Sequence, residues 1–80
     1  MNLVKLLARV RTNKHNVRFS DFVALIKAFG FEYDHQNGSH IGFKHTCGAS
    51  LNVQSAHGEA KSYQIDDLLE AVDKYQLRLK

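Results

Sequence analysis

The run Asn37–His45 combines a turn signal with residue types that can transfer protons and hold phosphate. Its leading Asn-Gly dipeptide favours a hairpin turn, because both residue types tolerate positive φ. In the strand expected after the turn, alternation places His40 and Lys44 on one face and the apolar side chains on the other. An imidazole beside the Ser39 hydroxyl and in line with an ammonium suits proton transfer on a phosphodiester. An outward histidine beside a turn is also commonly just a solvated polar residue, and both interpretations stay open here.

Helices are predicted from apolar residues spaced i, i+3, i+4 and i+7. This spacing occurs within residues 1–12 and again from residue 22 to residue 29. Ser20 is the predicted N-cap of the second helix, and Gly30 follows where that helix should end. A third apolar stripe predicts a final helix that starts near Ser62.

Alternating apolar and polar residues predict three strands between the second and third helices, at residues 31–34, 40–45 and 51–54. The order helix, helix, three strands, helix predicts an α+β domain with a three-stranded antiparallel sheet and helices on one face. The other sheet face would be polar and open, which suits a binding surface. The side chains expected on it are Glu32, Asp34, His40, Lys44, Asn52 and Gln54.

Length and composition indicate one domain of 80 residues with a single cysteine and a net charge of +3. No apolar run approaches a membrane span, and the lone cysteine fits a reducing, cytoplasmic setting. Residues 1–18 form a basic N-terminal helix and loop with five Lys or Arg and no acid, whereas all eight acids lie in residues 19–80. This segment suits a polyanion or an acidic protein partner, or is simply a solvated helix face.

Metal and nucleotide motifs are not indicated. His35, His40 and His45 are evenly spaced, but alternation puts the last two on opposite faces, and no C-x-x-C or H-E-x-x-H is present. We therefore expect no metal site. Lys61 precedes the last helix, where it would meet a phosphate near the helix N-terminus or remain a plain solvated lysine.

Three features in order resemble the HicA toxins of bacterial toxin–antitoxin pairs. They are the apolar helix ending in Gly30-Phe31, the run Gly38-Ser39-His40 before Phe43-Lys44-His45, and Gly58-x-x-Lys61 ahead of the last helix. The resemblance covers residues 19–80. It implies a double-stranded-RNA-binding-like α-β-β-β-α fold and a ribosome-independent mRNA endonuclease. The family's catalytic histidine maps onto His40, with Gly38 and Ser39 completing its motif, and the partner it implies is a HicB-like antitoxin.

The leading hypothesis is therefore an RNA endonuclease toxin in which His40 is a general acid or base. Gly38, Ser39, Lys44 and Lys61 are the expected RNA-binding residues. No cofactor, metal or membrane is expected, and the partners are mRNA and the antitoxin. Two alternatives are a non-catalytic RNA-binding module of the same fold and a protein-interaction adaptor that uses the open sheet face.

Overall fold

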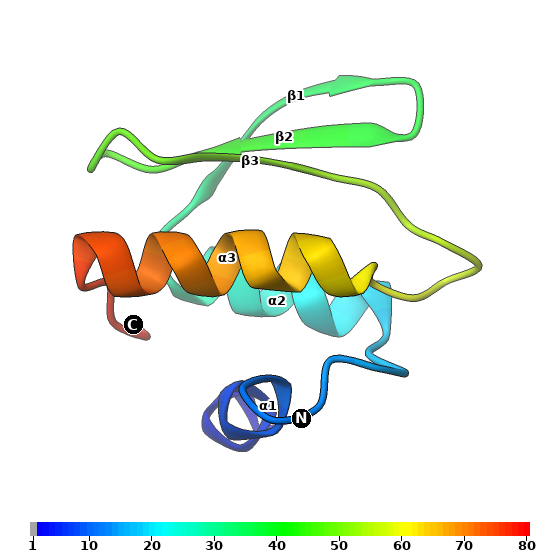
Figure 1. Cartoon of the computed structure of the whole chain (residues 1–80). Helices are drawn as coiled ribbons and strands as arrows, with labels where there is room; N and C mark the ends of the chain where they lie inside the picture. Colours follow the sequence, from blue (N-terminus) through cyan, green and yellow to red (C-terminus); the bar gives the residue numbers. More distant parts are fainter. Residues whose placement is uncertain (1) are drawn as a thin grey trace.

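The computed structural model describes residues 2–80. The elements in chain order are α1 (Leu3–Val10), α2 (Phe19–Ala28), β1 (Glu32–Asn37), β2 (His40–Lys44), β3 (Ser50–Val53) and α3 (Ser62–Tyr75). The strands form one antiparallel sheet in the order β1-β2-β3. Figure 1 shows the sheet as one layer, α2 and α3 as the next, and α1 beneath these helices on the side away from the sheet. The predicted α+β fold is confirmed, including the extra N-terminal helix.

The core lies between the sheet and the two helices α2 and α3. Every second side chain of β2 and β3 points into it, as Phe43, Leu51 and Val53 show. These side chains meet the apolar stripes of the helices, where Leu25, Ile26, Ile65 and Leu68 are fully buried. Burial of this apolar surface is the main force that holds the sheet on the helices. No helix within residues 2–80 covers the opposite face of the sheet.

The second helix begins two residues earlier than predicted and without a serine cap. Arg18 occupies the N-cap position and makes no side-chain hydrogen bond, so the expected role of Ser20 is wrong. The backbone explains the difference, because the N–H of Phe19 donates to the carbonyl of Gly58 at 2.9 Å. At the other end the prediction is confirmed, since Gly30 follows the helix with φ of 97°.

Strand β1 is more exposed than its sequence suggested. The strand predicted at residues 31–34 is present as the start of β1, but its predicted half-burial is wrong, because only Phe31 is buried and every residue of Glu32–Asn37 is exposed. β1 is an edge strand, and it extends past the helices that cover the rest of the sheet. A shift in the β1–β2 register between Tyr33 and His35 further interrupts the alternation.

The hairpin between β1 and β2 turns one residue later than predicted. Asn37 pairs with His40, so the two loop residues are Gly38 and Ser39. Gly38 has φ of 64° at the first loop position, as in a type II′ hairpin turn. The turn therefore sets His40 as the first residue of β2.

The basic N-terminal segment is docked on the helical layer. The two terminal guanidinium nitrogens of Arg11 donate to the carboxylate of Asp73, at 2.9 and 3.2 Å, and Lys14 Nζ lies 3.3 Å from Asp66 Oδ1. Arg9 donates to two backbone carbonyls of the loop that follows α1. These contacts hold the segment against α3, on the side of the molecule away from the open sheet face.

Candidate nucleic-acid interface

His40 is exposed at the start of β2, directly after the hairpin turn. Its neighbour Ile41 packs against the core and Phe43 is buried in it, so alternation directs His40 to the sheet face that no helix covers. The short turn and the two flanking strands hold the backbone at this point. The imidazole is thus displayed on a rigid element rather than on a long loop.

Ser39 and Lys61, which are distant in sequence, are joined through Gln54. The amide nitrogen Nε2 of Gln54 donates to Ser39 Oγ at 2.7 Å, and Lys61 Nζ donates to Gln54 Oε1 at 3.3 Å. Figure 1 shows why they meet, since the β1–β2 turn and the loop before α3 lie at the same end of the molecule. The ammonium of Lys61 is therefore held beside the turn that carries His40.

Gln64 and Tyr63, at the start of α3, hold the Ser39–Gln54–Lys61 contacts in place. The backbone N–H of Gln54 donates to Oε1 of Gln64 at 3.1 Å, and Gln64 is 1% exposed. The amide of Gln64 also donates to the Tyr63 hydroxyl at 3.2 Å. Lys61 Nζ lies 5.9 Å from the centre of the Tyr63 ring, within the range of a cation–π contact. A buried, fully bonded glutamine thus ties the end of β3 to the start of α3.

Lys44 lies at the far end of β2 from His40. Four residue steps along the strand separate them, a distance of about 13 Å along the backbone. Its Nζ atom is 3.4 Å from Asp34 Oδ1, and this carboxylate also accepts a 2.7 Å bond from His35 Nδ1. The hydrogen bond from His35, with a smaller effect of Lys44, lowers the pKa of Asp34 below its usual value. The structure thus gathers Ser39 and Lys61 near His40 and leaves Lys44 apart.

His45 has a structural role. Its Nε2 lies 3.1 Å from the carbonyl of Phe29, and its Nδ1 accepts from the backbone N–H of Cys47 at 2.9 Å. Because Nδ1 is an acceptor, Nε2 is the nitrogen that donates to the Phe29 carbonyl. The ring also packs edge-on against Phe31 at 5.1 Å. Within residues 2–80 no group of three His, Cys, Asp or Glu side chains could hold a metal ion.

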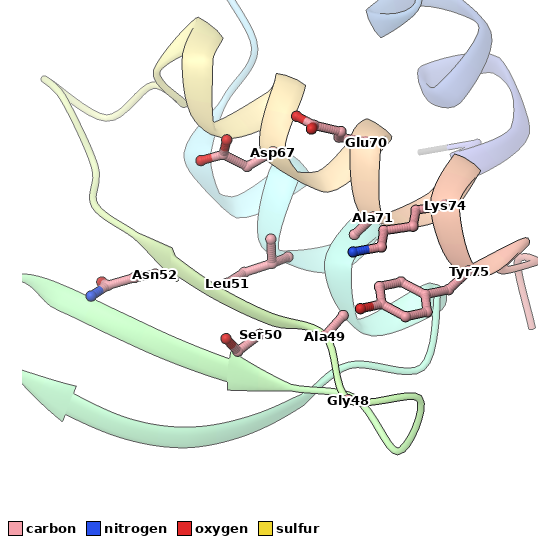
Figure 2. Close-up of a pocket in the computed structure, with 10 residues that line it drawn as sticks. All are labelled: Gly48, Ala49, Ser50, Leu51, Asn52, Asp67, Glu70, Ala71, Lys74 and Tyr75. Carbon is pink, nitrogen blue, oxygen red and sulfur yellow. The ribbon is translucent and has the colours of Figure 1, made fainter.

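A hollow of about 480 Å³ lies between β3 and α3, away from His40. Figure 2 shows Asp67 and Glu70 on α3 across from Ser50 and Asn52 of β3. Burial raises the pKa of Asp67, and the nearby charge of Glu70 adds to this shift. Carboxylates here repel a phosphate backbone. The open face around His40 is the better candidate for RNA.

Sequence reasoning did not include two residues in the candidate site. Gln54 was assigned to the open face but not to the site, because its role depends on contacts with two distant residues. His35 was placed with neither His40 nor Lys44, since strict alternation directs it to the other side of the sheet. The register shift in β1 is a consequence of pairing and leaves no clear signal in the sequence.

A family model described as the HicA toxin of bacterial toxin–antitoxin systems matches residues 19–73. The matched region contains α2, all three strands and most of α3, and it excludes α1. The comparisons found no match among curated proteins and none among solved structures. Across residues 2–80, no helix combines the length and apolar character needed to cross a membrane.

Proposed function

The chain belongs to the HicA toxin family of bacterial toxin–antitoxin systems, and we propose that it is an mRNA endonuclease whose proton-transfer group is His40. The observation that carries this proposal is the position of His40, exposed at the start of β2 on the uncovered sheet face. It stands immediately after Ser39, which Gln54 links to Lys61. An accessible imidazole therefore lies beside a fixed cation.

The reaction proposed is attack of a ribose 2′-hydroxyl on the adjacent phosphorus. His40 accepts the hydroxyl proton as the new oxygen–phosphorus bond forms, and the bond to the 5′-oxygen breaks. The products are a 2′,3′-cyclic phosphate and a 5′-hydroxyl. DNA lacks the attacking hydroxyl and is not a substrate for this chemistry.

Lys61 is the proposed phosphate ligand nearest to His40. It is half-buried at the N-cap position of α3, where backbone N–H groups of the first turn also favour an anion. Gly38 and Ser39 let the RNA backbone approach the turn closely. Lys44 is the proposed contact for a more distant phosphate, because exposed ion pairs such as Lys44–Asp34 exchange readily for another anion.

Substitution of His40 tests the proposal. Purified His40→Ala protein should lose RNA cleavage by at least about 100-fold, which is the low end of what general acid–base catalysis contributes. Its folding should be unchanged, because the side chain is exposed. His15→Ala is the matched control, since His15 is an exposed histidine in the loop between α1 and α2. Cleavage at the normal rate by folded His40→Ala would overturn the assignment.

We propose further that the partner is a HicB-like antitoxin that covers the sheet face around His40, and that both proteins act in the cytoplasm, where mRNA is located. An acidic partner surface would pair with Lys44 and Lys61 and associate quickly through electrostatic steering. An interface of standard size, about 1,600 Å² in total, would hide this face. Co-purification followed by hydrogen exchange tests this. Protection of the helices alone in an inactive complex would exclude occlusion of His40.

A further inference from the structure

The irregularity in β1 brings a second histidine to the face that carries His40. Tyr33 pairs with Phe43, whereas His35 pairs with Gly42, so two steps along β1 match one step along β2. Such a bulge reverses the alternation beyond it. Directly paired residues share a face. His35 therefore lies on the side of Gly42 and His40, although regular alternation from Tyr33 would direct it toward the helices.

The imidazole of His35 lies directly on the backbone of Gly42. A β-carbon built at Gly42 would overlap the ring, and the three nearest atoms to it all belong to His35. This contact explains why Gly42 is buried on a sheet face that no helix covers. Gly42 does not have positive φ, so the space for the ring, rather than the backbone conformation, accounts for a glycine here.

Asp34 orients this histidine. Its Oδ2 lies 2.7 Å from His35 Nδ1, while its Oδ1 faces Lys44 at 3.4 Å. A carboxylate that accepts from Nδ1–H leaves Nε2 to exchange a proton with another group. The side chain of His35 is 60% exposed, so much of the imidazole is open to solvent on this face.

We propose that His35 is a second catalytic residue, which donates a proton to the departing 5′-oxygen while His40 takes the proton of the 2′-hydroxyl. This inference rests on the proposed endonuclease activity. The imidazole of His35 lies over Gly42, which is two residues from His40 on β2. The two histidine positions are therefore about 6.6 Å apart along the open face. A phosphodiester seated between them would present its attacking and leaving oxygens to opposite sides.

The proton balance of the step is complete with these two residues. The 2′-oxygen to phosphorus bond forms as His40 gains a proton, and the phosphorus to 5′-oxygen bond breaks as the His35 imidazolium gives up its Nε2 proton. Asp34 keeps its bond to Nδ1–H throughout and is a positioning residue. Afterwards His40 returns its proton to water and His35 regains one, so no other reactant is required.

A modified RNA separates the two roles. In an oligonucleotide whose scissile 5′-oxygen is replaced by sulfur, the leaving thiolate departs without being protonated. His35→Ala should cleave ordinary RNA at least about 100-fold more slowly than the unmodified protein and cleave the sulfur-containing RNA at nearly the normal rate. Asp34→Asn should show the same pattern with a smaller loss. His40→Ala should be impaired on both substrates, and His15→Ala on neither.

His35→Gln guards against misfolding, because glutamine keeps a side chain over Gly42 but cannot act as an acid. It should behave as His35→Ala does on both RNAs. Normal cleavage of ordinary RNA by both His35 variants, with His40→Ala inactive, would overturn the role of His35 and leave the proposed function intact. Equal losses on both RNAs would also overturn it. Normal cleavage by His40→Ala would instead count against the endonuclease site itself.

Discussion

Replacing Gly42 with alanine separates the role of the His35 ring from the stability of the sheet. The new β-carbon would stand 2.7 Å from Nδ1 and 2.8 Å from Nε2 of His35, well inside van der Waals contact. The backbone at Gly42 accepts alanine without positive φ, and the exposed ring is free to move outward. The substitution should therefore displace His35 and leave the β2 backbone in place.

The two expected effects differ greatly in size. Alanine lowers the conformational entropy of the unfolded chain, which favours folding by about 0.4–1 kcal/mol. Loss of the contact with an exposed ring opposes this gain, so the free energy of unfolding should change by less than about 1 kcal/mol. Cleavage should fall about 100-fold, because the displaced imidazole no longer protonates the leaving oxygen.

Urea unfolding and single-site RNA cleavage measure these effects side by side. A double variant, Gly42→Ala with His35→Ala, gives the control: the alanine should cost no further activity once His35 is gone, because both changes act through one group. Normal cleavage by Gly42→Ala would refute the reasoning, and so would additive losses in the double variant.

Two further predictions concern charge. Lys61→Gln should reduce the slope of log affinity for single-stranded RNA against log salt by about 0.7, because one phosphate contact is lost. Arg11→Gln should leave that slope unchanged and lower stability instead, since Arg11 is bonded to α3 on the far side of the molecule. Asp67→Asn should raise the melting temperature at neutral pH. The pKa of Asp67 is raised in the folded state, so its charge opposes folding above that pKa, and the gain should vanish as pH falls below the unfolded value. Asp66→Asn is the control with the opposite sign at neutral pH, because it breaks the pair with Lys14. A gain for Asp67→Asn that persists at low pH would exclude this explanation.

The sequence alone determined the features that depend on neighbouring residues. Apolar spacing predicted all three helices, and Gly30 marked the end of α2. The alternation in β2 and β3 predicted which side chains reach the core. The same alternation singled out His40, and three motifs in order along the chain indicated the family. These signals are local, because helix period, strand period and turn geometry act over only a few residues.

Only the tertiary structure decided which distant groups lie together in the candidate site. Pairing with β2 introduced the shift in β1 that brings His35 over Gly42, and strict alternation could not predict it. Gln54 joins Ser39 to Lys61 because the end of β3, the hairpin turn and the start of α3 meet at one end of the fold.

The basic segment at residues 1–18 illustrates the same limit. Its charge left a polyanion, an acidic partner and a solvated helix face open, and the fold adds that Arg11 and Lys14 pair with acids of α3. A count of charges along the chain gives their number and order. Which charges pair with one another follows from how the layers pack. An ion pair needs two charges within a few ångströms, and for residues far apart in sequence only packing brings them that close.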